Sequence, residues 1–252
     1  RSFGEAGNKV VIEEFLQGEE ASFIVLTDGK TVLPLASSQD HKTRDDQDKG
    51  PNTGGMGAYS PAPVITTEIH KKILDQVIMP TIKGLAKEGI TYCGFLYAGL
   101  MIDNKQNIKV LEFNCRFGDP ETQPILMRLD SDLVELCYKA SKKELKQIKL
   151  KWNSKVSLGV VMASGGYPQE YEKGHPIEGL PPENENLKVF HAGTLAENKL
   201  IKTDGGRVLC VTALGKNISE AQLNAYNYVK QIKWKDCFYR TDIGYRAVER
   251  ES

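Results

Sequence analysis

The segment that begins at Leu111 constrains this chain most, because a short alternating strand there runs directly into a turn rich in glycine, proline and charge. Side chains alternate along a β-strand, so Glu112 and Asn114 are expected on one face and a buried apolar row, Leu111 and Phe113, on the other. A carboxylate and an amide oxygen side by side suit Mg²⁺ that bridges nucleotide phosphates. If the chain stays extended, Arg116 falls on the same side and can hold a carboxylate or phosphate. An amphipathic strand with its polar face in water is the alternative.

A long polar loop from Ser37 to Pro63 is the second feature, and it is punctuated by glycine and proline. A loop of that length inside a compact domain is uncommon unless it is functional. Its glycines, Gly54 to Gly57, let backbone N–H groups converge on an anion without obstruction by a Cβ atom. It is not a P-loop, because Met56 stands where the lysine would be. A mobile surface turn is the alternative.

The acidic segment from Glu13 to Glu20 is the third feature. A backbone segment between two lobes can hydrogen-bond an adenine edge, while a carboxylate takes the ribose hydroxyls. Glu20 is the candidate for the ribose. The alternative is that these acidic side chains are simply solvated in a hairpin connection.

The remaining pattern predicts an α+β chain. Helical spacing over 66–88 has Thr66 or Thr67 as its cap, Gly89 as its stop and Pro80 as a bend or break. Further helices are expected at 131–148 and 219–232, the last capped by Ser219. β-rich runs are expected at 10–16, 21–26, 31–36, 95–102, 108–115, 156–163, 189–192 and 208–213, with a turn at Asp28-Gly29. A lysine-rich linker at 142–154 leads into a second unit.

Composition narrows the class of protein. The 33 basic residues balance the 33 acidic residues, so no overall field favours nucleic acid or an anionic membrane. No apolar run approaches the roughly 20 residues that span a bilayer. The five cysteines include no C-x-x-C pair, which argues against a disulfide framework or zinc cage and for the cytoplasm. The chain opens at Arg1 without an initiator Met, so we interpret it as the C-terminal piece of a longer protein.

These motifs together resemble the glycinamide ribonucleotide synthetase (phosphoribosylamine–glycine ligase) family of ATP-grasp ligases. The resemblance runs in order along the whole chain and rests on Ile12–Glu20, Gln39–Tyr59, Arg116–Gln123, Phe190–Thr194, Gly205–Val208 and Asp242–Arg246. It implies an α+β fold, with a large ATP-grasp lobe built on a mixed sheet with helices and a small α+β C-terminal domain. The implied divisions are a lid remnant at 1–11, the core lobe at 12–150 and a cap at 151–252, like the cap of biotin-carboxylase-like enzymes.

The resemblance implies ligation of glycine to 5-phosphoribosylamine with ATP, through glycyl phosphate, in de novo purine synthesis. It implies Mg²⁺ or Mn²⁺ on Glu112 and Asn114, and a catalytic Arg116. The implied ATP-binding residues are Glu13, Glu14, Phe15, Leu16 and Glu20, with backbone of Glu14 and Leu16 on the adenine. The implied substrate-binding residues are Asp40, Lys42, Asn52, Thr53, Gly54, Gly55, Gly57, Arg116 and Asp119.

Two departures from the family pattern qualify this reading. Most of the nucleotide lid is missing, so we expect the isolated chain to be a poor catalyst. Ala98 to Met101 offers no third acidic metal ligand. Another ATP-grasp carboxylate–amine ligase and a catalytically silent nucleotide-binding fragment are the alternatives. We expect small-molecule partners only, no nucleic acid or membrane, and a monomer or weak homodimer.

Overall fold

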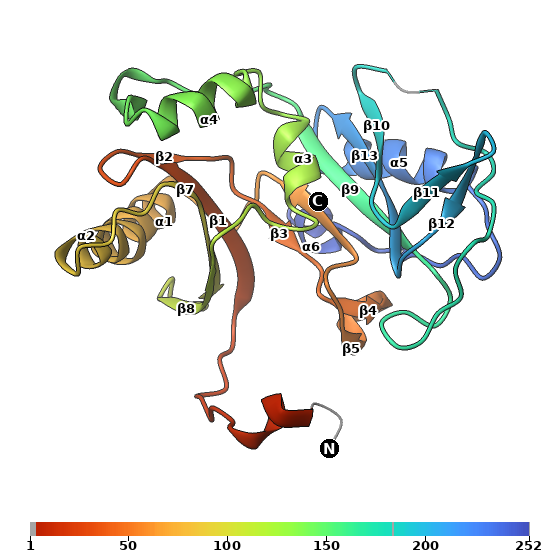
Figure 1. Ribbon diagram of the computed structural model, residues 1–252, viewed down its shortest axis with the longest axis horizontal. Helices are drawn as coiled ribbons and strands as arrows, with labels where there is room; N and C mark the ends of the chain where they lie inside the picture. The colour runs from red at the N-terminus through yellow and green to blue at the C-terminus, as the bar shows by residue number, and fades with distance from the viewer. Residues whose placement is uncertain (1–3, 183, 252) are drawn as a thin grey trace.

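Two sheets organise the computed structural model, which describes residues 4–182 and 184–251. One sheet has four strands in the order β2-β1-β7-β8, and the other has five in the order β10-β13-β9-β6-β3 (Figure 1). The α+β class is as expected. Within the described residues every pairing in these two sheets is antiparallel, where a mixed sheet was expected. The tight turns between β1 and β2 and between β7 and β8 permit only antiparallel neighbours.

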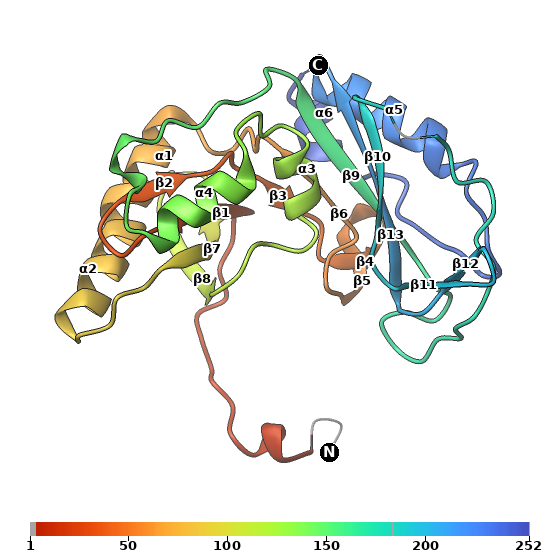
Figure 2. The ribbon, with the colours of Figure 1, turned by 45° about the horizontal axis from the view of Figure 1, so that its top comes forward.

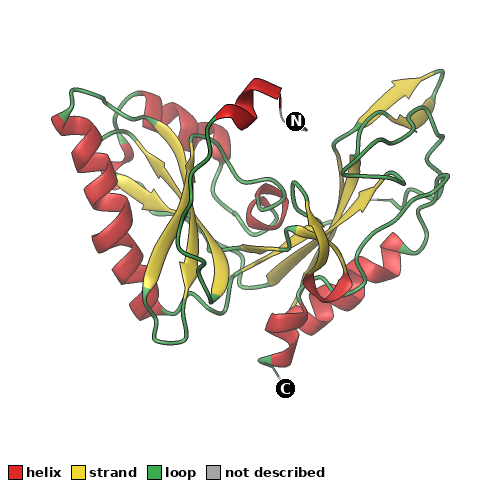
Figure 3. Ribbon diagram, turned by 90° about the horizontal axis from the view of Figure 1, so that it is seen from below, coloured by secondary structure: helices red, strands yellow, loops and turns green. Residues whose placement is uncertain are grey.

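The four-stranded half matches the sequence pattern closely. Its strands are β1 (Glu19–Thr27), β2 (Val32–Pro34), β7 (Gly94–Ile102) and β8 (Ile108–Asn114). Asp28 accepts hydrogen bonds from the backbone of Lys30 and Thr31 at 3.0 and 2.7 Å, which fixes the predicted turn. Helices cover one face of this sheet, with Phe23, Ile73 and Leu100 buried between the layers (Figure 3).

The expected helix over 66–88 is confirmed, with a break inside it. It forms α1 (Thr67–Ile73), a π-helical turn (Leu74–Ile78) and α2 (Met79–Lys87). The Thr66 hydroxyl caps α1 by accepting a hydrogen bond from the Ile69 N–H at 3.2 Å. Pro80 lies in the first turn of α2, where its missing N–H interrupts the helical ladder. Gly89 follows with a φ of 80°.

The apolar row expected on β8 is not buried. Phe113 is 42% exposed and Leu111 is half-buried, because β8 is the outer strand of its sheet. The alternation also shifts at Leu111. Gly99 pairs with Glu112 while the next residue of β7 pairs with Val110, so Leu111 is an extra residue in a β-bulge.

The loop expected over 37–63 contains four short strands. It contains β3 (Gln39–Asp40), β4 (Thr43–Asp45), a 3₁₀ turn (Asp46–Asp48), β5 (Lys49–Asn52) and β6 (Gly57–Ser60). β6 pairs with β9 (Val156–Ala163), so residues from the expected core lobe complete the sheet of the C-terminal half. The rest of that sheet is β10 (Leu187–His191) and β13 (Arg207–Gly215).

The helices of the second half differ in their ends from the prediction. α5 (Ile218–Val229) is capped by Asn217, whose side chain accepts a hydrogen bond from Glu220, rather than by Ser219. The segment expected as one helix over 131–148 ends early, as α4 (Leu133–Ser141) and a 3₁₀ turn (Leu145–Gln147). The remaining elements are α3 (Thr122–Leu126), which lies between the two halves (Figure 2), α6 (Tyr245–Glu249), and the hairpin of β11 (Thr194–Glu197) and β12 (Leu200–Thr203).

The N-terminal arm is the largest departure from the prediction. A 3₁₀ turn (Gly4–Asn8) leads into an extended segment that projects away from both sheets, and the strand expected over 10–16 does not form (Figures 1 and 2). Ile12 is 93% exposed and Phe15 is 88% exposed. A strand needs a neighbour for its backbone groups, and none of the described strands pairs with this segment. No helix among the described residues is long and apolar enough to cross a membrane.

Candidate active site

A cavity of about 270 Å³ lies where the end of β8 faces the segment from Gln39 to Ser60. We call it the central cavity. It brings together nine predicted site residues from three separate parts of the chain: Asp40, Lys42, Asn52, Thr53, Gly54, Glu112, Asn114, Arg116 and Asp119. Tyr97 and Glu121 complete its lining.

The strand register sets the two expected metal ligands side by side. Glu112 pairs with Gly99 and Asn114 pairs with Tyr97, so both side chains share the sheet face opposite α1 and α2. Gly99 leaves room for the Glu112 side chain, because a Cβ there would lie 3.1 Å from its Cγ. The preceding strand therefore adds no acidic group at this point, as the sequence indicated.

This donor set suits a metal that shares its coordination with a substrate. A carboxylate and an amide oxygen supply two hard ligands, and Mg²⁺ commonly takes its other ligands from phosphates and water. Within 4–182 and 184–251, no group of three or more His, Cys, Asp or Glu residues could hold a metal ion.

The glycine-rich wall of the cavity is fixed by contacts at both ends. The backbone N–H and the hydroxyl of Thr53 donate to the Lys42 carbonyl at 2.7 and 2.8 Å. The Arg207 guanidinium donates to the Gly54 carbonyl at 2.6 Å and to the Asp119 carboxylate at 2.7 Å. Gly55 has a φ of 110°, and a Cβ there would lie 2.3 Å from the ring of Pro120.

The predicted substrate residues Gly55 and Gly57 do not line the central cavity. Gly55 packs on the turn that carries Asp119, and Gly57 is buried in β6 opposite Val160. Their role in this geometry is to let neighbouring backbones approach closely.

Charged side chains, two of them buried, concentrate on one side of the central cavity. The Lys42 ammonium lies 2.8 Å from the Glu20 carboxylate. Burial, reinforced by the nearby Glu121 carboxylate, raises the pKa of Asp40 to about 8. Burial lowers the pKa of Lys42, but the carboxylates of Asp40 and Glu20 outweigh it, so the net pKa is raised. Glu121 is itself buried and accepts a hydrogen bond from the Ser22 hydroxyl at 2.6 Å.

The expected ATP-binding residues lie along the arm. Two cavities of about 440 and 360 Å³ share Glu14, Phe15, Leu16, Met101 and Lys109, and the smaller also contacts Glu13 and Leu111. Glu20 lies apart from both.

Glu20 instead lines a third cavity of about 160 Å³. This cavity shares Met101 with the arm cavities and shares Asp40 and Lys42 with the central cavity. The cavities therefore follow one another from the arm to the metal-ligand pair.

Comparison with known proteins shows to which family this chain belongs. Residues 1–122 match the ATP-grasp (A) domain of phosphoribosylglycinamide synthetase, and residues 157–246 match its C domain. The phosphoribosylamine–glycine ligase of Vibrio vulnificus strain CMCP6 is 62% identical over 251 residues, which is 99% of this chain and 58% of the relative. The chain belongs to the phosphoribosylglycinamide synthetase family. The Escherichia coli K12 ligase of the same description is 61% identical over 252 residues, 99% of this chain and 59% of its own.

Solved structures agree with this family. The crystal structure of phosphoribosylamine–glycine ligase from Thermotoga maritima aligns with a TM-score of 0.81 at 34% identity, covering 92% of this chain and 57% of its own. The biotin carboxylase domain of a thermophilic 2-oxoglutarate carboxylase shares the fold, with a TM-score of 0.63 at 15% identity, covering 87% of this chain and 48% of its own. The chain spans about 58% of the length of the curated relatives that it matches.

Three residues in or beside the central cavity were not assigned a role from the sequence. Tyr97 and Glu121 line the central cavity, and Arg207 fastens its glycine-rich wall. Glu121 belongs to the motif that carried the resemblance, and Tyr97 lies at the alternating position opposite Asn114. Arg207 follows two glycines in a turn and belongs to the Gly205–Val208 motif of the same resemblance.

Proposed function

We propose that this chain supplies the metal-ligand pair, the substrate cavity and part of the ATP site of a phosphoribosylamine–glycine ligase. The observation that carries the proposal is the central cavity, where Glu112 and Asn114 face Lys42, Arg116 and the glycine-rich wall. The continuity of this cavity with those along the arm supports an extended nucleotide that reaches the metal-ligand pair. The ligase description of the relatives supplies the substrates.

The proposed reaction has two displacements. The glycine carboxylate attacks the γ-phosphorus of ATP, so an O–P bond forms, the bond to ADP breaks and glycyl phosphate results. The amine of 5-phosphoribosylamine then attacks the glycyl carbonyl, loses a proton and expels phosphate, which leaves an amide. Phosphorylation is required because a carboxylate is a poor acyl donor.

The residues around the cavity have distinct roles in this scheme. Backbone groups of Glu14 and Leu16 hold the adenine, and the Glu20 carboxylate accepts hydrogen bonds from the ribose hydroxyls. Arg116 and Lys42 offset charge that develops on the transferring phosphoryl group. Mg²⁺ or Mn²⁺ held by Glu112 and Asn114 would polarise the phosphates.

The test is ADP release by the full-length protein with ATP, Mg²⁺, glycine and 5-phosphoribosylamine, with each substrate omitted in turn. We expect release to require both glycine and the amine, and to fall at least about 100-fold in Glu112→Gln. Turnover with another acid or amine would assign the site to a different ATP-grasp ligase. No turnover with any pair would favour a silent nucleotide-binding protein.

Several finer points belong to the same proposal. We assign 1–11 to the lid, 12–150 to the core lobe and 151–252 to the cap, with β3 and β6 crossing from the core lobe into the sheet of the cap. A cytoplasmic location and a monomer or weak homodimer stay predictions. We also expect the isolated 252-residue chain to be far less active than the full-length protein, which a steady-state assay of both decides.

A further inference from the structure

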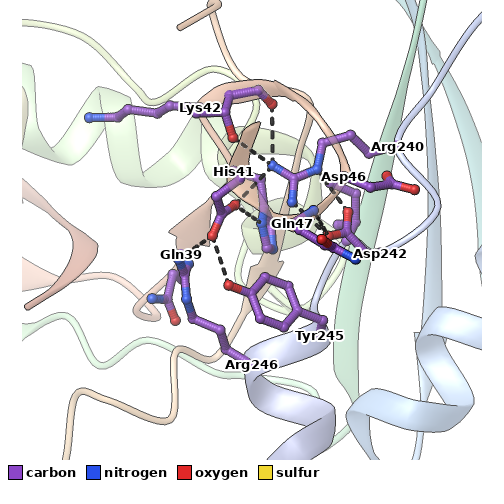
Figure 4. A network of polar contacts seen from close by, with 12 residues as sticks. Gln39, His41, Lys42, Asp46, Gln47, Arg240, Asp242, Tyr245 and Arg246 are labelled. Atoms are coloured by element: carbon purple, nitrogen blue, oxygen red, sulfur yellow. Dashed lines mark hydrogen bonds and ion pairs between the residues drawn. The ribbon is translucent and has the colours of Figure 1, made fainter. Parts of the chain in front are cut away.

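A buried network of charges fastens the segment behind the central cavity to the C-terminal end of the chain (Figure 4). We call this network the clasp and define it as Thr43, Asp48, Arg240, Asp242 and Tyr245. None of the five was assigned a role from the sequence, and none of them lines the central cavity.

Arg240 is the centre of the clasp and is only 1% exposed. Its guanidinium lies 3.0 Å from the Asp48 carboxylate and donates to the Asp242 carboxylate at 2.8 and 2.9 Å. It also donates to the hydroxyl and carbonyl of Thr43 at 3.0 and 3.2 Å. A buried charge of this kind is costly to desolvate and persists only where several partners share it.

Asp48 has further hydrogen-bond partners, and its backbone conformation is strained. Its carboxylate accepts hydrogen bonds from the Tyr245 hydroxyl at 2.7 Å and from Arg246. Gln47 and Asp48 have φ values of 59° and 54°, which side-chain-bearing residues adopt only where the surroundings impose it. The Gln47 N–H donates to Asp242 at 2.8 Å, so the clasp also holds the strained turn.

Alternation along the chain connects the clasp to the central cavity. Thr43 faces Arg240, and the His41 ring accepts a hydrogen bond from the Gly244 N–H at 2.9 Å. The residues between and before them, Asp40 and Lys42, line the central cavity. One face of this short extended segment is therefore fastened to the C-terminal segment while the other presents a carboxyl and an ammonium to the cavity.

We propose that the clasp is a positioning device that sets Asp40 and Lys42 at the cavity wall. The clasp residues act through these two side chains. Thr43 and Asp48 also line the third cavity, whereas Arg240, Asp242 and Tyr245 line none of the four cavities described above. The proposal rests on the proposed function for the identity of the substrates that Asp40 and Lys42 meet. Packing of the halves alone does not require a fully buried arginine, since apolar side chains of similar volume pack as well or better.

Hydrogen exchange of the full-length protein tests the placement without any assay of activity. Tyr245→Phe removes one donor to Asp48 and keeps the ring, and Thr43→Val removes one acceptor from Arg240. We expect each to lower protection of the His41, Thr53 and Met56 amides about tenfold, with the strands β9 and β13 unchanged. The matched control is Tyr92→Phe, which removes a hydroxyl that donates to the Phe95 carbonyl at 2.6 Å and leaves the clasp intact.

A double-mutant cycle tests the action through Lys42. We expect Tyr245→Phe to lower kcat/KM for the amine about threefold while KM for ATP is unchanged. In a Lys42→Met background, Tyr245→Phe should lower kcat/KM for the amine less than about 1.5-fold, because the Lys42 side chain that the clasp positions is gone.

Each result decides the proposal. Protection lost equally over β9 and β13, unchanged protection, or additive effects of Tyr245→Phe and Lys42→Met would each overturn it. Failure of the unmodified full-length protein to release ADP with glycine and the amine contradicts the proposed function instead, and hydrogen exchange then decides whether the clasp sets the segment.

Discussion

At the scale of single residues, Arg207 joins two walls of the site that are far apart in sequence. Its fork reaches Gly54 and Asp119 at once, and a lysine ammonium cannot span both. We expect Arg207→Lys to lower kcat/KM of the full-length protein about tenfold with little change in the melting temperature. Arg44→Lys, whose partner is its neighbour Asp45, is the matched control and should keep full activity. Equal losses in both variants would contradict this role.

Asp40 makes stability depend on pH in a way that can be measured. Its pKa is raised to about 8, first by burial and then by Glu121, whereas an unfolded chain ionises the same group near 3.8. The folded state therefore holds the extra proton between these values, and stability falls as pH rises towards 8, by at most about 1.4 kcal/mol per pH unit. We expect Asp40→Asn to melt above the parent at pH 9 and much closer to it at pH 6. Parallel melting curves from pH 6 to 9, without metal or nucleotide, would show that Asp40 contributes nothing.

The sequence predicts where a single side chain points when the alternation of a β-strand fixes that direction. Glu112 and Asn114 share a face as predicted, because a strand imposes that period. Leu111 was placed wrongly, since a bulge is set by the partner strand and leaves no local sign. Arg240 was not found because two of the three partners of its guanidinium, Thr43 and Asp48, lie almost 200 residues away along the chain.

At the scale of elements, the glycine-rich wall depends on close contact with the turn at Pro120. Gly55 has a φ of 110° and no room for a side chain there. We expect Gly55→Ala to cost at least about 2 kcal/mol of unfolding free energy and to lower activity, measured by urea unfolding and ADP release. The control is Gly84→Ala in α2, where a Cβ meets no atom within 4 Å, and which should add up to about 1 kcal/mol. A neutral Gly55→Ala would mean that the wall moves freely.

Elements with local causes were predicted well, and elements with distant causes were not. Capping by Thr66 and the break at Pro80 follow from residues within one helix, so α1 and α2 were predicted from sequence. The strands β3 and β6 looked like loop because their glycines and prolines are turn residues. They are strands because β9, about 100 residues later, pairs with β6, and β6 in turn pairs with β3. The arm from 10 to 16 is the opposite case. Its residues are typical of a β-strand, but none of the described strands lies beside it, so no strand forms.

At the scale of the whole molecule, two strands from the first half of the chain belong to the sheet of the C-terminal half, and this limits where the chain can be divided. The C-terminal half depends on β6, which forms a full register with β9, and on Met56 and Tyr59, which are fully buried in its core. Burying each of these side chains contributes about 1.5–3 kcal/mol, a large share of the 5–15 kcal/mol typical of a domain. We expect residues 151–252 alone to lack a cooperative unfolding transition, followed by the fluorescence of the buried Trp234. Joining residues 37–63 to this piece through a flexible linker should restore the transition, because it returns β3, β6 and both core side chains. A cooperative transition with native near-ultraviolet circular dichroism in 151–252 alone would show that the cap folds without the segment that walls the site.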